Sequence, residues 1–444
     1  MPTAALPLPA TLAPATLATG QRRAIWSASL SSLAQWYDWY AFPAFSLYFA
    51  GAFFPTEDAT AQLLYSAGIF ALGFLMRPLG SWLFGRLADK LGRRPSLTLS
   101  GLLMGLGSLL LALTPTYQTV GLVAPAMLLT ARLLQGLSVG GEYGVAAAYL
   151  AEVAGRERRG FYSSFLYTTL IAAQLLALGA QLVLQRVLVP AQLLDWGWRL
   201  PFVGGAVLAG LALYLRARLP ETAPFAASHR LPEARRGSLR ALRQHPRAVL
   251  GVLGLTMGGT LAFYTFTTYM PKFLVNTAGL PQPVATWVCF GSLLGFGLMQ
   301  PLCGALADRI GRRPLLLFFG VAGALGTVPL LAALGHAPGP WAALGLLLLA
   351  FVVVSGYSAT NALVKAELFP VGIRALGIGL PHAVTVALFG GSAEYLALWC
   401  KQIGHESYFF WYVAGCIGAS LPLLLLLPET RRASCLDTDP QPAA

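Results

Sequence analysis

Stretches of mainly apolar residues, each long enough to cross a lipid bilayer as a helix, recur along the whole chain. A membrane-spanning helix needs about 20 such residues. The stretches lie near residues 24–54, 61–85, 96–113, 119–148, 160–185, 197–217, 248–275, 282–305, 314–334, 340–366, 373–400 and 406–428. Only 11% of the residues are charged, against about 25% in a typical soluble domain. The sequence therefore predicts an all-α membrane protein with twelve transmembrane helices.

One long polar segment, residues 220–247, divides these stretches into two sets of six. It is rich in proline and arginine, which is typical of a linker. The predicted parts are an N-terminal tail at 1–23, a six-helix bundle at 24–219, the linker at 220–247, a second six-helix bundle at 248–428 and a C-terminal tail at 429–444. Residues 1–20 lack the basic start and compact apolar run of a cleavable signal, so we expect the first helix to be retained.

Most of the 30 Lys and Arg residues fall on one side of this arrangement. They precede the first stretch, follow the even-numbered stretches and fill the linker. Because cytoplasmic loops of membrane proteins carry an excess of Lys and Arg, both tails and the linker are predicted to be cytoplasmic.

The same rule accounts for the formal net charge of +13, which in a soluble protein would suggest nucleic acid. We expect no nucleic-acid partner. The chain contains no GxxxxGK[ST], HExxH or GxSxG motif. Its five cysteines do not have the close spacing of a metal site. The sequence therefore argues against an enzyme and against a metal site.

A ten-residue loop sequence occurs twice. Residues 85–94 read GRLADKLGRR, and residues 304–313, at an offset of 219 positions, read GALADRIGRR. A second repeat is formed by Glu152 and Arg159, which recur as Glu367 and Arg374 at an offset of 215 positions. Repeats of this length indicate two pseudo-symmetric bundles, as in one large group of secondary transporters.

These loops resemble the GxxxD(R/K)xGRR loop of the major facilitator superfamily. Further residues resemble the metabolite:proton symporter family within it, and most closely its bacterial alpha-ketoglutarate carriers. The matching segments are 36–40 (WYDWY), 70–94, 131–144, 196–202 (WGWRLPF), 263–278 and 389–396 (FGGSAEYL). The resemblance implies a proton-coupled symporter of the bacterial inner membrane, which imports alpha-ketoglutarate or a closely related dicarboxylate by alternating access. Protons would be the coupling ion, with no other cofactor.

Two other kinds of function remain open. A symporter of the same family could carry citrate, shikimate, or an osmolyte such as proline or betaine, although the chain lacks the C-terminal heptads that the resemblance associates with osmolyte carriers. A non-transporting membrane sensor is a rival from another class, but the linker and the C-terminal tail are short for a signalling domain. The expected partners are a small organic acid, protons and the lipid bilayer, and we expect a monomer.

Arg77 and Arg132 lie well inside predicted spans, where a charged side chain is costly and therefore faces the bundle interior. Either they form structural ion pairs, or they bind an anion. A guanidinium group holds a carboxylate with two parallel hydrogen bonds, so two arginines suit a dicarboxylate. By contrast, Lys272 near an outer helix end and Lys365 near an inner end are expected to reach toward the membrane surface.

Three acids, Asp38, Glu142 and Glu394, also lie within predicted spans. Burial raises the pKa of a carboxyl group and a nearby arginine lowers it, so such a group can exchange a proton as its surroundings change. We expect Asp38 or Glu142 to pair with Arg132 when no substrate is bound. The alternative for each acid is static hydrogen bonding in its neutral form.

Other residues complete the predicted site. Polar and aromatic side chains expected to line it are Tyr40, Gln135, Gln174, Tyr264 and Tyr269. Residues expected to gate the cytoplasmic side come from the two repeated loops, and they are Gly85, Asp89, Arg93, Gly304, Asp308 and Arg312. A loop carboxylate there is expected to cap the positive N-terminus of another helix and to pair with arginines.

Overall fold

The computed structural model describes residues 19–91, 93–154, 156–217, 239–337, 339–370 and 373–438. Within these ranges, the structure does not describe the side chains of some residues, which are 19–31, 85–86, 88–97, 149, 152–153, 215–217 and 240–241. Parts of the predicted tails, 1–23 and 429–444, and of the predicted linker, 220–247, therefore lie outside the described residues.

The described part of the first half consists of helices and contains no strand. Its helices are α1 (Thr19–Phe53), α2 (Ala59–Leu91), α3 (Arg93–Leu113), α4 (Tyr117–Val120), α5 (Val123–Gly140), α6 (Glu142–Val153), η1 (Arg156–Arg158), α7 (Arg159–Val187), α8 (Pro190–Asp195), η2 (Gly197–Arg199) and α9 (Leu200–Ala217).

The described part of the second half is likewise helical and free of strands. Its helices are α11 (Leu239–Leu242), α12 (Pro246–Tyr264), η4 (Thr265–Tyr269), α13 (Met270–Asn276), α14 (Gln282–Ile310), α15 (Arg312–Gly335), α16 (Pro340–Ser358), α17 (Asn361–Glu367), α18 (Arg374–Thr385), η6 (Val386–Gly390), α19 (Gly391–Gln402), α20 (Glu406–Leu426) and α21 (Cys435–Thr438).

Ten segments of the described residues are long and apolar enough to cross a membrane. The two other predicted spans correspond to the long helices α1, with 35 residues, and α3, with 21 residues. The twelve predicted spans thus all correspond to helices. Large apolar side chains that point outward, such as Leu302, Leu325 and Trp341, are exposed, as expected for a surface that faces lipid.

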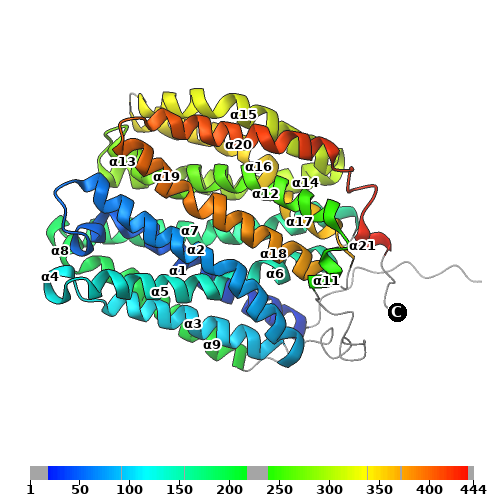
Figure 1. The fold of residues 1–444 in the computed structure, drawn as a ribbon, viewed down its shortest axis with the longest axis horizontal. Coiled ribbons are helices and arrows are strands. Elements are labelled where there is room, and N and C mark those ends of the chain that lie inside the picture. The colour runs from blue at the N-terminus through cyan, green and yellow to red at the C-terminus, as the bar shows by residue number, and fades with distance from the viewer. Residues whose placement is uncertain are drawn as a thin grey trace, which may run out of the picture.

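The helices run roughly side by side, with the first half in the lower part of Figure 1 and the second half above it. The halves meet where α7 packs on α14 and where α2 packs on α18 and α19. Glycines permit this close approach. A Cβ atom on Gly144 of α6 would lie 2.6 Å from the carbonyl oxygen of Ala375 in α18, closer than a real Cβ atom can come.

Two spans are interrupted at corresponding places in the halves. The fourth breaks at Gly141, between α5 and α6, and the tenth breaks between Ser358 and Asn361, which separate α16 from α17. The offset between these breaks matches that of the sequence repeat. Short π-helical segments, η4 and η6, interrupt two further spans of the second half. Such irregular segments in transmembrane helices are frequent at functional sites.

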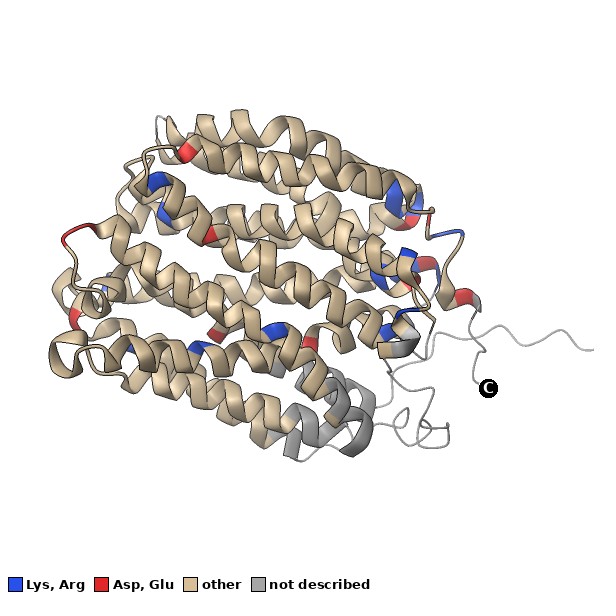
Figure 2. Cartoon of the chain, in the orientation of Figure 1, with Lys and Arg blue, Asp and Glu red and all other residues tan. Residues whose placement is uncertain are grey.

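Charged residues gather at one end of the bundle, where the C-terminus lies (Figure 2). We call this the basic end. The described side chains that define it include Arg156, Arg159, Arg309, Arg312, Arg313 and Arg431. A few charged residues lie between the two ends, inside the bundle.

Candidate functional site

Arg77 and Arg132 lie together in the interior of the first half, around one indole ring. Arg77 comes from α2 and is 4% exposed, whereas Arg132 comes from α5 and is fully buried. Their guanidinium carbons are 4.3 and 4.2 Å from the ring centroid of Trp39. Glycines bring the two helices together, because a Cβ atom on Gly140 would meet the carbonyl oxygen of Arg77 at 2.1 Å. The aromatic ring stabilises both cations through its negative faces.

Some N–H donors of these two arginines have no acceptor among the described residues. Arg132 Nη1 donates to Gln135 Oε1 at 2.6 Å, and Gln135 Nε2 donates to Ser108 at 3.0 Å. The Nε and Nη2 atoms of both Arg77 and Arg132 are buried and have no hydrogen-bond acceptor among the described residues. Buried donors of this kind are costly unless a ligand or water satisfies them. The arrangement can therefore accept an anion.

Asp38 lies in α1 next to Trp39 and is fully buried. Its charge acts electrostatically on Arg132, but the ion pair expected between Arg132 and Asp38 or Glu142 does not occur among the described side chains. Arg132 is bound by Gln135 instead. Glu142 begins α6 at the break in the fourth span and is 9% exposed.

Glu394 of α19 forms an ion pair of 2.6 Å with Lys272 of α13. Lys272 also donates to the carbonyl oxygen of Pro43 at 3.0 Å, which links the second half to α1. Both charged side chains are buried. The prediction that Lys272 reaches toward the membrane surface is therefore wrong, since a carboxylate holds the ammonium group inside the bundle.

The residues predicted to line the site lie in different places. Tyr40 stacks on Trp36 in α1, with ring centroids 5.8 Å apart. Tyr264 contacts Phe74 of α2 across the two halves at 5.2 Å. Gln174 of α7 is 5% exposed, and its Oε1 atom has no partner among the described residues. Tyr269 is bound elsewhere, since its hydroxyl donates to Glu406 at the start of α20.

A further buried cation lies at the contact between the halves. Lys365 of α17 is fully buried, and its Nζ atom is 2.9 Å from both Asn361 Oδ1 and His382 Nδ1. The ring of His382 stacks on that of Tyr143 at 3.7 Å, and the Tyr143 hydroxyl donates to Asn361 Oδ1 at 3.0 Å. The prediction that Lys365 reaches toward the membrane surface is also wrong, because these polar groups hold it inside.

Contacts between the halves hold them together at the basic end. Asp308 of α14 accepts the backbone N–H groups of Gly160 and Phe161, at 2.7 and 2.9 Å. It therefore caps the N-terminus of α7, as expected for a loop carboxylate. A Cβ atom on Gly160 would lie 2.4 Å from the carbonyl oxygen of Gly304, so both glycines permit the contact. Arg312 approaches Asp308 and Glu367 at 3.4 and 3.5 Å.

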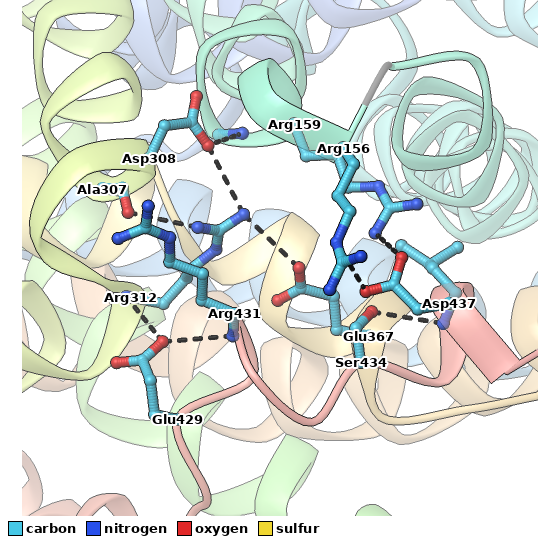
Figure 3. A network of polar contacts seen from close by, with 12 residues as sticks. Arg156, Arg159, Ala307, Asp308, Arg312, Glu367, Glu429, Arg431, Ser434 and Asp437 are labelled. Atoms are coloured by element: carbon cyan, nitrogen blue, oxygen red, sulfur yellow. Dashed lines mark hydrogen bonds and ion pairs between the residues drawn. The ribbon is translucent and has the colours of Figure 1, made fainter. Parts of the chain in front are cut away.

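The segment after α20 crosses this end (Figure 3). Glu429 accepts the backbone N–H groups of Arg312 and Arg313, both at 3.0 Å, and so caps α15. Asp437 pairs with Arg156 at 3.3 Å and with Arg159 at 2.8 Å. The C-terminal segment is thus bonded to both halves. For the other predicted gating residues, Gly85, Asp89 and Arg93, the structure describes only the helical backbone.

Polar contacts also join the halves at the end away from the C-terminus. Gln185 donates to Tyr48 at 2.6 Å and to Thr286 at 3.2 Å. Asp58, in the loop before α2, accepts a hydrogen bond from Gln402 at the end of α19. This bond, together with one from the backbone N–H of Thr60, holds the pKa of the Asp58 carboxyl below its usual range. The buried charges therefore lie between two ends at which polar contacts join the halves.

Residues 26–393 match the family model described as the Major Facilitator Superfamily. The chain belongs to the major facilitator superfamily. Its fold agrees, since it resembles the solved structure of the proton:xylose symporter XylE of E. coli with a TM-score of 0.76 and 19% sequence identity, over 94% of this chain and 98% of that one. It is therefore a multi-pass membrane protein.

Curated relatives within the superfamily are transporters. The chain is 54% identical to the alpha-ketoglutarate permease of Escherichia coli (strain K12), over 88% of this chain and 91% of that protein. It is 34% identical to the citrate-proton symporter of Klebsiella pneumoniae, over 80% of each. The predicted family is thus confirmed.

Sequence reasoning missed the Lys365 cluster and the C-terminal contacts of this superfamily member. One signal for the cluster was available, since Asn361 and Lys365 are four residues apart and share a helix face. A second was the repeat, because Asn361 and Tyr143 are 218 positions apart. By contrast, Asp437 and Glu429 lie in a polar tail, and no local pattern there indicates a partner.

Proposed function

We propose that this chain is a proton-coupled symporter that imports alpha-ketoglutarate, or a closely related dicarboxylate, by alternating access. The observation that carries the proposal is the pair of buried guanidinium groups of Arg77 and Arg132, whose Nε and Nη2 atoms lack acceptors among the described residues. An anionic substrate satisfies them. The identity of 54% to an alpha-ketoglutarate permease supports the choice of anion. Gln135, Gln174, Tyr40 and Tyr264 are the proposed polar and aromatic neighbours of the substrate.

Proton coupling follows from the charge of the substrate. A dianion that enters an inside-negative cell works against about 2.3 kcal/mol per charge per 100 mV, or about 4.6 kcal/mol in all. Co-transport of two protons offsets this charge. Asp38 is the proposed proton carrier because it is fully buried and acts on Arg132, and Glu142 and Glu394 are the other candidates.

Alternating access requires that the basic end open and close. The proposed gate consists of Asp308, Arg312, Gly304 and their repeat counterparts Asp89, Arg93 and Gly85. The capping of α7 by Asp308, at 2.7 and 2.9 Å, supports this role in the closed state. The excess of basic side chains at this end supports a cytoplasmic location for it, with both termini inside a bacterial cell and with the bundles at 24–219 and 248–428 moving about a central site.

Uptake by purified protein in liposomes tests the proposal. With the lumen alkaline, labelled alpha-ketoglutarate should accumulate, and dissipation of the pH gradient should abolish accumulation. Unlabelled succinate should compete, whereas proline should not. Inhibition by proline alone would indicate an osmolyte carrier, and preferential inhibition by citrate would indicate a citrate symporter. Uptake that is indifferent to the pH gradient would contradict proton coupling.

A further inference from the structure

Two lysines are fully buried in the second half, and they differ in their partners. Lys272 has a carboxylate at 2.6 Å, that of Glu394. Among the described residues, the partners of Lys365 are the neutral acceptors Asn361 Oδ1 and His382 Nδ1, and it forms no ion pair with a described acid. A buried ammonium group without a counter-ion is costly in a protein and more so in a membrane. Lys365 therefore resembles the two arginines of the first half, which likewise form no ion pair within 4.0 Å with a described acid.

The contacts of Lys365 leave part of its bonding capacity unused. An ammonium group has three N–H donors and no acceptor. Asn361 and His382 account for two of the donors. Because the ammonium group donates to His382 Nδ1, the ring proton of a neutral His382 lies on Nε2. No described residue accepts the third N–H of Lys365, which can therefore bind another acceptor.

The position of this group points to a ligand between the halves. Lys365 belongs to the second half, yet its Nζ atom lies 5.6 Å from the ring centroid of Tyr143 in the first half. Tyr143 and Lys365 follow the corresponding breaks in the fourth and tenth spans. Interrupted helices at equivalent positions of two repeats are the places where transporters of repeat architecture bind their substrates.

The cations of both halves lie next to aromatic side chains at the contact between the halves. The Lys365 ammonium group of the second half lies beside the ring of Tyr143 of the first half. The ring of Phe74, under the Arg77 guanidinium at 4.3 Å, contacts Tyr264 of the second half at 5.2 Å. A ligand with a negative charge at each end matches this distribution, with one end toward the arginines and the other toward the lysine.

We propose that Lys365, held by Asn361 and His382, binds one carboxylate of the dicarboxylate substrate. Arg77 and Arg132 bind the other carboxylate. This inference rests on the proposed function. The substrate then bridges the two halves. A monocarboxylate of the same length binds the arginines but leaves Lys365 without a carboxylate. Lys365 is therefore the residue that selects for a substrate with two negative charges.

Binding to purified wild-type and variant protein tests this assignment. The probes are alpha-ketoglutarate and alpha-ketovalerate, which is the same five-carbon keto acid with a methyl group in place of the second carboxylate. Wild-type protein should prefer alpha-ketoglutarate. Lys365→Met should lower this preference by about tenfold or more, the effect of one charge-assisted hydrogen bond, because the affinity for alpha-ketovalerate hardly changes. Lys401→Met, the same exchange at a partly exposed site near the end of α19, should leave the preference unaltered.

The outcomes separate the inference from the proposed function. If wild-type protein binds no alpha-ketoglutarate, both are overturned. If wild-type protein binds it but Lys365→Met weakens both probes equally, only the inference is overturned, since Lys365 then has a purely structural role. If the Lys365→Met variant does not fold, the Lys365→Arg variant tests the assignment instead. Its longer side chain should shift the preference from glutarate toward the shorter succinate, and an unchanged glutarate-to-succinate ratio would overturn the assignment.

Discussion

Asp308 in the second half accepts the backbone N–H of Gly160 in the first half at 2.7 Å. Its other carboxylate oxygen accepts the next N–H, that of Phe161, at 2.9 Å. One acidic side chain thereby holds the positive end of α7 against α14, on the helix pair that joins the two halves. The same carboxylate is 3.4 Å from Arg312, so the contact depends on charge as well as on shape.

Replacing Asp308 by Asn should favour opening of the basic end. The substitution removes the charge that faces the α7 N-terminus, and a helix cap of this type contributes about 1–2 kcal/mol. We expect the open fraction to rise about tenfold. Spin labels at the exposed positions 157 and 309 should report longer distances. Asp195→Asn, the same exchange at the exposed last residue of α8, serves as the control and should not alter the distance distribution.

Replacing Gly160 by Ala should oppose closure by steric means alone. The added Cβ atom would lie 2.4 Å from the carbonyl oxygen of Gly304, while the backbone N–H that Asp308 binds is kept. Overpacking of this kind costs about 1–3 kcal/mol, so transport should fall about tenfold. Gly326→Ala has no atom within 4 Å of its new Cβ and should transport normally. Equal rates for the two variants would show that the close contact is dispensable.

The fold was predictable because lipid imposes simple rules on sequence. Apolar stretches of sufficient length give the helices, and the repeated loops at 85–94 and 304–313 indicate the two halves. The burial of Arg77 and Arg132 was predictable because a charged side chain that faces lipid is costly in free energy. Lys272 and Lys365 were misjudged, because position along a helix does not determine which face points inward. Only tertiary packing brings Glu394 to one lysine and His382 to the other.

Two contacts of the C-terminal segment should differ in strength. Glu429→Ala leaves the backbone N–H groups of Arg312 and Arg313 without their acceptor, which should lower the free energy of unfolding by about 1–3 kcal/mol. Asp437→Ala removes ion pairs with Arg156, whose side chain is 72% exposed, and with Arg159. The Arg159 side chain is only 12% exposed, but the carboxylate of Asp437 is 23% exposed, so solvent screens both pairs in part and the loss should stay below about 1 kcal/mol. Unfolding in detergent measures both.

Salt provides the check on this pair of variants. The Asp437→Ala effect should become clearly smaller at about 1 M salt, where the screening length is about 3 Å. The Glu429→Ala effect should largely persist, because it arises from backbone donors that lose their partners. A larger loss for Asp437→Ala than for Glu429→Ala would contradict this ranking.

Asp38→Asn should separate transport from proton coupling. Asn keeps the size of the side chain and cannot release a proton. The variant should still exchange labelled for unlabelled alpha-ketoglutarate across the liposome membrane, but should not accumulate it when a pH gradient is imposed. Accumulation that remains dependent on the pH gradient would exclude Asp38 as the proton carrier and leave Glu142 and Glu394.

The Lys272–Glu394 pair calls for a double-mutant cycle. Removal of one partner of a buried ion pair leaves an uncompensated charge and costs about 3–5 kcal/mol, whereas replacement of both by apolar residues is often neutral. Glu394→Leu should therefore destabilise the protein strongly, and the added Lys272→Met should restore most of the loss. Thermal unfolding of the four proteins measures this coupling. The cycle also tests Glu394 as a proton carrier, because a stable double variant that still accumulates substrate along a pH gradient would assign the pair a structural role only.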